Sequence, residues 1–493
     1  MIRTSLSGQV KWTDTEMYLR LIIKVLNKAL LTCALPISVI GCCGPKDPTP
    51  DINYLADFHR AYFSSQEDVI EEGNLALYVD YSTCIADAMQ TMTMSKFYMD
   101  IVPSLTNAAK QYFSIKGNQI KEENGVDVYS LLRSVSEVNY ADLRTAVNMI
   151  ADGNTEAILL TDGEYYEQSI AKSHVNDPYM APALEKWLTR GHDVYIFSEP
   201  YVEIHKGHQY NKKRFYFLFT DSRLHDNIFS KIEKNVKIED YPDVRYYHLT
   251  ANNPSLQINR ETAKFGDCAT PNELLMCRPE AYGNFEIEDW SNMDWKSIKK
   301  YIFNAYDQIT GEALPDGDMV ITGLALDKNF QGGCYRIEDI DLKVYGLNQA
   351  YKDFVNNLSD SDTGETVPVN KVVQEHPLSL SPAPNFMKLD KKEFAEQGLI
   401  NIYFDTQMFD PTILYDGDPW SYFKLDITVK DYSDNFSHNP MAEDIFTFDS
   451  IDMPGNSNIS IVESIKQVVS KPAVSNMVKG KTIYSIYVRT NKY

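Results

Sequence analysis

Short apolar runs that end at polar residues divide the first half of the chain into predicted strands and helices. Residues 75–79 and 157–160 are apolar runs that stop at Asp80 and just before Asp162. Runs of four or five apolar residues followed by a polar loop are typical of buried parallel strands. Further strands are predicted at 111–122, 194–197, 215–219 and 245–249, and helices at 52–72, 84–109, 141–150, 177–188 and 226–234.

The alternation of strands and helices predicts a doubly wound α/β domain over residues 52–254. Its central parallel sheet is expected to contain the strands at 75–79, 157–160, 194–197 and 215–219. A turn is expected at 124–125, where Asn is followed by Gly.

The hydrophobic pattern changes after about residue 255. Short aromatic and β-branched runs, several of them alternating with polar residues, lie between turns rich in Gly, Asn, Asp and Pro. This pattern is typical of half-buried antiparallel strands and predicts a sandwich-like β-rich domain over 255–493, as one unit or two subdomains. Residues 354–385, rich in Ser, Asp and Pro, predict a long loop, and 459–469 fits a helix.

The N-terminus carries the pattern of an export signal. A basic segment at 20–28 precedes an apolar run at 29–40, which is too short to span a bilayer. The run ends in Val-Ile-Gly-Cys, which resembles a bacterial lipobox with Cys42 as the lipid-modified residue. We therefore predict a lipoprotein signal peptide at 1–42 and a proline-rich tether at 43–51.

Two details of this signal stay open in the sequence. The true start is Met1 or Met17, and Cys43 is an alternative lipid acceptor. An ordinary cleaved signal with an incidental cysteine is the alternative interpretation. A lipid on Cys42 would place the protein at the outer membrane or cell surface, as in Bacteroidota-like lipoproteins.

Composition narrows the class of partner. The formal net charge is −22, which argues against nucleic-acid binding, because that requires a basic face. The seven cysteines form no CxxC pair and no zinc-site spacing, and scattered buried thiols are the expected state. Cys268 and Cys277 could pair in an oxidising compartment.

Candidate chemistry follows the two strands that end at acids. Asp80-Tyr81-Ser82-Thr83-Cys84 follows the first, and Thr161-Asp162-Gly163 follows the second. Ligands of open α/β sheets bind outside the carboxyl ends of the strands. Asp80, Ser82 and Asp162 can therefore meet there and offer oxygen ligands to Mg²⁺, Mn²⁺ or Ca²⁺.

These motifs resemble the metal-ion-dependent adhesion site of the von Willebrand factor A (vWA) family over roughly residues 52–250. The family shows Asp-x-Ser-x-Ser, a Thr on a second loop, and Thr-Asp-Gly. Asp80, Ser82 and Asp162 match, whereas Cys84 replaces the last Ser and Ala141 replaces the Thr; Asp142 is a candidate additional carboxylate. The resemblance implies a vWA/Rossmann-like fold and an ion that keeps one position open for an acidic group of a partner protein.

Several alternatives remain. Strand-end Asp and Ser residues also cap helices, so the motifs fit a scaffold without an ion in a structural envelope protein. His205 and His208 are weak zinc candidates. The β-rich half could bind glycans, and a hydrolase with an unrecognised site is a further possibility, although no Gly-x-Ser-x-Gly, phosphate loop or His-Glu-x-x-His motif occurs. We predict a non-enzymatic lipoprotein that recognises a protein or matrix ligand or assists envelope assembly.

Overall fold

The computed structural model describes fifteen stretches of the chain, all within one compact unit, Pro50–Tyr493. The predicted signal peptide, Cys42 and the tether lie outside them. None of the helices in these stretches is long and apolar enough to cross a membrane. The described residues are 52–63, 75–82, 96–124, 140–167, 172–224, 226–251, 258–259, 264–265, 285–289, 299–303, 319–326, 332–359, 363–383, 387–404 and 420–491.

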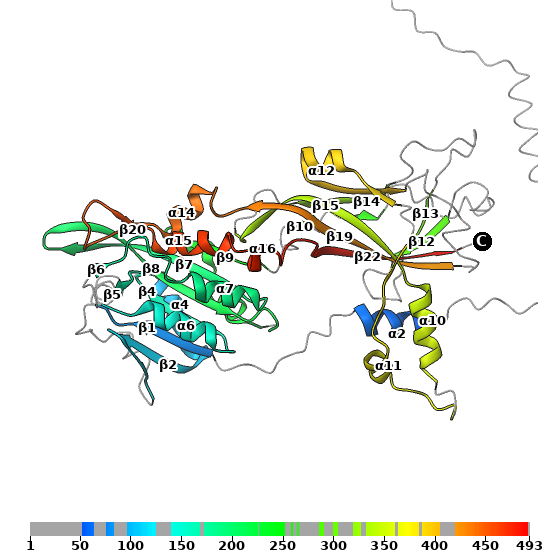
Figure 1. Cartoon of the computed structure of the whole chain (residues 1–493), viewed down its shortest axis with the longest axis horizontal. Helices are drawn as coiled ribbons and strands as arrows, with labels where there is room; N and C mark the ends of the chain where they lie inside the picture. Colours follow the sequence, from blue (N-terminus) through cyan, green and yellow to red (C-terminus); the bar gives the residue numbers. More distant parts are fainter. Residues whose placement is uncertain are drawn as a thin grey trace, which may run out of the picture. The chain divides into compact units, whose positions relative to one another are not determined.

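A seven-stranded mixed sheet carries the candidate site (Figure 1). Its strand order is β3-β2-β1-β4-β8-β7-β9, and only β2, β1 and β4 run parallel to one another in neighbouring pairs. The strands are β1 (Leu75–Asp80), β2 (Ala109–Lys116), β3 (Gln119–Glu122), β4 (Ala157–Thr161), β7 (Asp193–His205), β8 (His208–Thr220) and β9 (Arg245–Leu249).

The prediction of a parallel sheet of four strands is wrong for the strands at 194–197 and 215–219. Strands 194–197 and 215–219 are the bases of one antiparallel hairpin, β7 and β8, closed by Lys206 and Gly207. Both turn residues have positive φ, 50° and 81°, which is the geometry that joins two antiparallel strands tightly. Parallel neighbours need a crossover connection of a dozen or more residues, and the chain between these two runs remains in strand instead.

A second hairpin replaces the predicted single strand at 111–122. β2 and β3 pair in antiparallel register around Gly117, whose φ is 58°. This hairpin turns at Gly117 and Asn118; Asn124 of the predicted turn is also in a turn, and Gly125 lies outside the described residues. Gly adopts this left-handed backbone without steric cost, which explains the choice of position.

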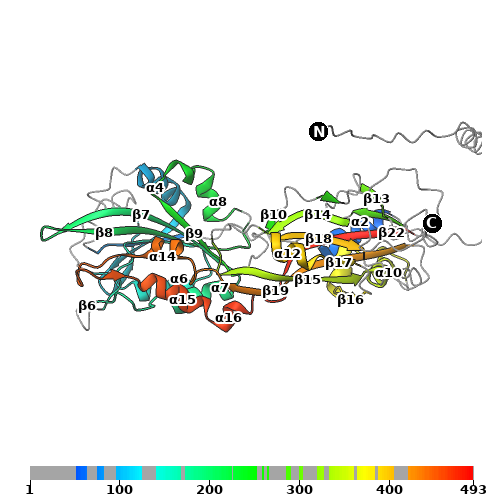
Figure 2. The same cartoon turned by 90° about the horizontal axis from the view of Figure 1, so that it is seen from above.

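Helices cover both faces of the mixed sheet (Figure 2). Alternate strand residues divide between two cores: Leu77 and Leu218 pack with the helices of one face, and Leu159 and Phe217 with those of the other. The first face carries α4 (Lys96–Ala108) and α8 (Ile228–Glu233). The second carries α6 (Leu143–Asp152), α7 (Ala181–Thr189) and α15 (Ser460–Val469).

Residues 258–491 contain two larger antiparallel sheets, as the alternating pattern predicted. Their sandwich-like packing remains a prediction. One sheet comprises β10 (Ile258–Asn259), β11 (Lys264–Phe265), β14 (Met319–Leu326), β17 (Met387–Leu389) and β18 (Leu399–Phe404). The other comprises β12 (Phe285–Asp289), β13 (Lys299–Phe303), β15 (Tyr335–Gly346), β16 (Ser381–Pro382), β19 (Trp420–Asp434) and β22 (Thr482–Asn491).

Short elements complete the fold. The predicted loop at 354–385 contains the end of α10 (Asn348–Asn357) and the whole of α11 (Val369–Glu375). Helix α11 buries Val372. The remaining strands are the pairs β5 (Tyr166–Glu167) with β6 (Lys172–Ser173) and β20 (Phe448–Asp449) with β21 (Ser457–Asn458). The remaining helices are α2 (Ile52–Phe63), η2 (Ile238–Asp240), α10 (Asn348–Asn357), α11 (Val369–Glu375), α12 (Lys391–Gln397), α14 (Pro440–Phe446) and α16 (Pro472–Ser475).

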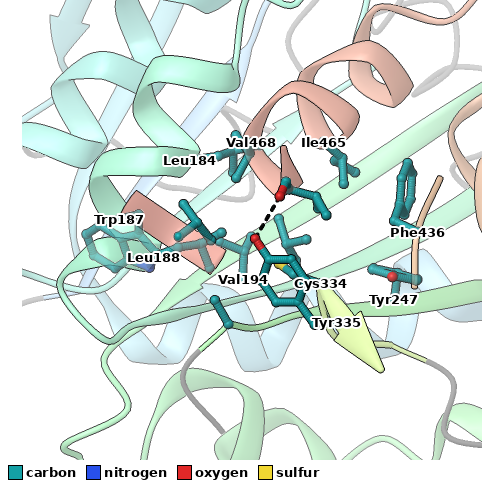
Figure 3. Packing of buried hydrophobic residues seen from close by; sticks show 14 of the residues in the cluster. Leu184, Trp187, Leu188, Val194, Tyr247, Cys334, Tyr335, Phe436, Ile465 and Val468 are labelled. Atoms are coloured by element: carbon teal, nitrogen blue, oxygen red, sulfur yellow. Dashed lines mark hydrogen bonds between the residues drawn. The ribbon is translucent and has the colours of Figure 1, made fainter. Parts of the chain in front are cut away.

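One hydrophobic core joins the helices of the second face to the C-terminal half. Figure 3 shows Leu184 of α7, Ile465 of α15 and Cys334 in the same core. The Tyr335 hydroxyl donates a hydrogen bond to the Val469 carbonyl at 2.7 Å. Cys334 is a free, fully buried thiol, and burial raises its pKa well above the usual range, in agreement with the predicted structural role.

Helix α2 packs against segments that lie far from it in the sequence. Its Leu55 and Phe58 are fully buried in a third cluster with α10, α11 and the start of β19. His59 Nδ1 lies 2.5 Å from the Tyr422 hydroxyl, and burial lowers the pKa of this histidine to about 4. The helix predicted at 52–72 is confirmed over 52–63, residues 64–72 lie outside the described residues, and the helix belongs to the packing of the C-terminal half.

Candidate functional site at the ends of β1 and β4

The parallel pairing of β1 and β4 brings Asp80 beside Thr161. The Thr161 hydroxyl donates to Asp80 Oδ2 at 2.8 Å, and the Ser82 backbone N–H donates to Asp80 Oδ1 at the same distance. Asp80 is completely buried because it is the last residue of a strand whose six residues are all buried. Both oxygens of this carboxylate therefore already accept hydrogen bonds.

Asp162 lies in a tight turn directly after β4. The Glu164 N–H donates to Asp162 Oδ1 at 2.9 Å, and the Gly163 N–H donates to the Thr161 hydroxyl at 3.0 Å. Gly163 has a φ of 76°, a left-handed conformation that glycine adopts without strain. The turn thus orients Asp162 inward, where the side chain is 1% exposed.

Two oxygen atoms of the site stand out. Within the described part of the chain, neither Ser82 Oγ nor Asp162 Oδ2 has a hydrogen-bond partner, although both are buried. Ser82 Oγ is nevertheless close enough to Asp80 to lower the pKa of that carboxyl. Buried oxygen atoms without partners are costly and indicate a water, a cation or a proton that completes the site.

Burial and mutual repulsion govern the protonation of the two aspartates. Desolvation is the main reason that the pKa of Asp162 rises to about 8; Lys212 lowers this pKa, and the nearby Asp80 and Glu164 raise it. Desolvation also raises the pKa of Asp80, against the hydrogen bonds from Ser82 and Thr161. The two aspartates are therefore poor at holding two negative charges at once.

A lysine that the sequence analysis did not single out completes the site. Lys212 of β8 has a fully buried side chain, and its Nζ lies 2.7 Å from Glu164 Oε2. The other oxygen of Glu164 accepts hydrogen bonds from the hydroxyls of Ser173 at 3.0 Å and Ser450 at 3.5 Å. In the sequence, Lys212 stands in a run of polar and basic residues, which is the usual pattern of a solvated strand, so no local signal marks it.

The C-terminal half covers the site through residues 444–464, which we call the covering segment. Phe448 lies against Lys212, with its ring centre 4.9 Å from Nζ. A Cβ atom on Gly163 would lie 2.7 Å from Ile461 Cδ1, so the covering segment and the turn after β4 are in tight contact there. Backbone hydrogen bonds fix the contact further, including Ile459 N–H to the Val175 carbonyl at 2.6 Å.

The other predicted ligand positions have different roles. Asp142 is the N-cap of α6: its two oxygens accept from the backbone N–H and the hydroxyl of Thr145 at 3.0 and 2.8 Å. Ala141 is buried and forms a bridge with Gly117, and its methyl side chain offers no oxygen. Cys84 lies outside the described residues.

The arrangement is a partial match to a divalent-cation site. Ser82 Oγ and Asp162 Oδ2 are available, each oxygen of Asp80 already accepts one hydrogen bond, and Ala141 offers no side-chain oxygen. The described stretches contain no group of three or more His, Cys, Asp or Glu side chains placed to hold a metal ion. The donor set visible here therefore does not complete the coordination shell of a hard cation.

The histidine candidates lie away from this site. His205 and His208 face each other at the tip of the β7–β8 hairpin, beside the exposed Ile204. As throughout the described stretches, no third ligand joins them. Two imidazoles alone do not form the four-coordinate site that zinc prefers.

Comparisons of the chain with protein-family models, with curated protein sequences and with solved structures found no match.

Proposed function

We propose that the chain is a non-enzymatic lipoprotein of the bacterial cell envelope, anchored through Cys42, that recognises a protein or matrix ligand with a vWA-like module. The observation that carries the proposal is the convergence of Asp80, Ser82 and Asp162 at the ends of β1 and β4. Helices on both faces of a sheet with three parallel strands support the same assignment.

The burial of these side chains limits how a partner can use them. Asp80 and Asp162 are 0 and 1% exposed, and the covering segment packs over the adjacent turn. A partner that contacts the carboxylates must displace part of this segment. A partner that binds nearby instead depends on the carboxylates only through the shape of the turns.

A panel of immobilised matrix and envelope proteins, read by biolayer interferometry with the full chain, tests the proposal. Asp80→Asn and Asp162→Asn keep the size of each side chain and replace its carboxyl group by an amide. We expect both substitutions to weaken binding of the recognised ligand about tenfold or more, a loss of ~1.4 kcal/mol. Asp142→Asn, at a helix cap, is the matched control and should bind normally; equal affinity of all four proteins would contradict the proposal.

Dependence on Mg²⁺, Mn²⁺ or Ca²⁺ remains a prediction from the resemblance. The unpartnered Ser82 Oγ and Asp162 Oδ2 are the oxygens that such an ion would use. An ion that binds the native state raises its melting temperature. Titration of each ion into the full chain, beside Asp162→Asn, shows whether the ion binds there.

Two other functions stay as alternatives. Glycan binding by the β-rich half would use exposed aromatic side chains, whereas Tyr335, Tyr351 and Tyr422 are buried in packing contacts. A glycan array probed with the full chain tests this alternative. A panel of ester, phosphate and glycoside substrates tests for hydrolysis, and turnover of any of them would contradict the non-enzymatic assignment.

A further inference from the structure

The burial of Lys212 requires a compensating negative charge. Lysine is among the residue types least often buried, and a desolvated ammonium costs several kcal/mol unless it is paired. The side chain of Lys212 is 0% exposed, and its Nζ lies 2.7 Å from Glu164 Oε2. The same ammonium acts electrostatically on Asp162, two residues before that glutamate. One positive charge therefore serves two neighbouring carboxyl groups.

The surroundings of Lys212 keep this charge in place. Phe448 of the covering segment lies against the ammonium, where the face of an aromatic ring attracts a cation. Glu164 is held from its other side by the hydroxyls of Ser173 and Ser450. The glutamate therefore faces Lys212 with one oxygen while the other is fixed, which makes the pair a built part of the fold.

The oxygen atoms near this pair are badly placed for a second cation. Each oxygen of Asp80 already accepts one hydrogen bond, from Thr161 or from Ser82, which leaves fewer lone pairs for an ion. Ala141 supplies no oxygen where the resemblance implies one. A divalent ion near Asp162 would also be repelled by the ammonium already present.

We infer that the ammonium of Lys212 is the resident cation of this site and takes over the role that a divalent ion has in the adhesion sites that the chain resembles. The inference rests on the proposed function for the identity of the site. It adds that the site keeps its structure, and any ligand its affinity, in the presence of a chelator. In the absence of a partner, the covering segment then closes over a metal-free site.

Thermal unfolding of the full chain with Mg²⁺, Mn²⁺, Ca²⁺ or EDTA tests the inference. We expect the melting temperature of the unmodified chain to stay constant in all four. Lys212→Met should lower it by about 5–10 °C, because Glu164 and Asp162 lose their cation inside the protein. In this variant the vacated site should gain an ion response of about 5 °C, which disappears in Lys212→Met with Asp162→Asn.

Lys213→Met is the matched control. It removes the next lysine of the strand, whose ammonium contacts the Asp444 carbonyl, and it should leave the ion response absent. An ion response of the unmodified chain, or none in a folded Lys212→Met variant, would overturn the inference. If Lys212→Met does not fold, the titration of the unmodified chain decides alone.

These measurements use no partner. Failure to find a ligand would contradict the proposed function and leave the result on Lys212 intact. Conversely, an ion response of the unmodified chain would overturn the role of Lys212 and strengthen the original metal prediction.

Discussion

Two buried cations lie two residues apart on β8, and each pairs with a glutamate. Lys212 contacts Glu164 at 2.7 Å, and Arg214 contacts Glu199 at 2.6 Å. Around Arg214, Glu199 Oε2 also accepts from the Tyr216 hydroxyl, and the guanidinium lies 4.2 Å from the ring centre of Tyr98.

Around Lys212 there are further carboxyl groups besides the direct partner. Asp162 and Asp80 add two carboxyl groups beside Glu164, and Asp162 Oδ2 has no partner within the described part of the chain. Arg214 and Glu199, by contrast, are both buried and form an ion pair inside the core. Two buried ion pairs of similar length on one strand can therefore differ in how many further carboxyl groups lie near the cation.

The largest effect is expected from breaking the ion pair between Arg214 and Glu199. Arg214→Met leaves Glu199 buried without its cation, which should cost about 3–5 kcal/mol of unfolding free energy. No divalent ion should restore this loss, since the pair offers a single carboxylate. Urea unfolding with and without Mg²⁺ measures both. Arg223→Met, at an arginine that is 56% exposed, is the control and should cost ~1 kcal/mol or less; restoration by Mg²⁺ would remove the distinction between the two sites.

His59, which belongs to neither ion pair, makes its own contribution to the pH dependence of the unfolding free energy. Burial lowers the pKa of His59 to about 4 in the folded chain, against 6.5 for a free histidine. The folded state therefore excludes a proton that the unfolded state binds below pH 6.5. This stabilisation is complete above pH 6.5 and is lost as the pH falls through 4, by about 3 kcal/mol in total. Urea unfolding of His59→Gln should show a correspondingly flatter acid limb; an unchanged limb would refute the assignment.

The contact between the covering segment and the Thr161–Gly163 turn offers a smaller perturbation. Gly163→Ala places a Cβ 2.7 Å from Ile461 Cδ1 at a φ of 76°, and should cost about 1–3 kcal/mol. Gly207→Ala has a similar φ of 81° but open space around it, so it isolates the backbone strain. Thermal unfolding compares the two, and an equal loss in both variants would show that the covering segment yields freely.

The smallest effect is expected at the tip of the β7–β8 hairpin. Ile204 is 69% exposed, far from the buried cations of the same hairpin. Ile204→Ser should change the unfolding free energy by less than about 0.5 kcal/mol. Urea unfolding measures this change. A larger loss would mean that the tip packs against another molecule under the conditions used.

The sequence predicted the elements of the site better than their surroundings. The apolar runs at 75–79 and 157–160 appear as β1 and β4, and both acids lie at the strand ends as expected. Local hydrophobic patterns suffice there, because a buried strand must be apolar on both faces. Whether these acids bind an ion depends on groups from other parts of the chain, and patterns of this kind do not report them.

Long-range packing explains the misses. The hairpin β7–β8 depends on a two-residue turn inside a polar stretch that resembles a connection between parallel strands. Lys212 is buried by Phe448, and His59 by Tyr422, across several hundred residues of sequence. For Lys212 and His59 the local sequence fits an exposed side chain, and the residue that packs against each lies in the C-terminal half.

The covering segment also has a consequence for the order of folding. Contacts between distant parts of a chain form slowly, since a large loop must close before they contribute. The Asp80–Asp162 turns lie in the first third of the chain, yet residues 444–464 complete their surroundings, and β22 then inserts between β12 and β19. The two acidic turns therefore stay in contact with solvent until this distant segment has packed, so closure of the site is a late step of folding.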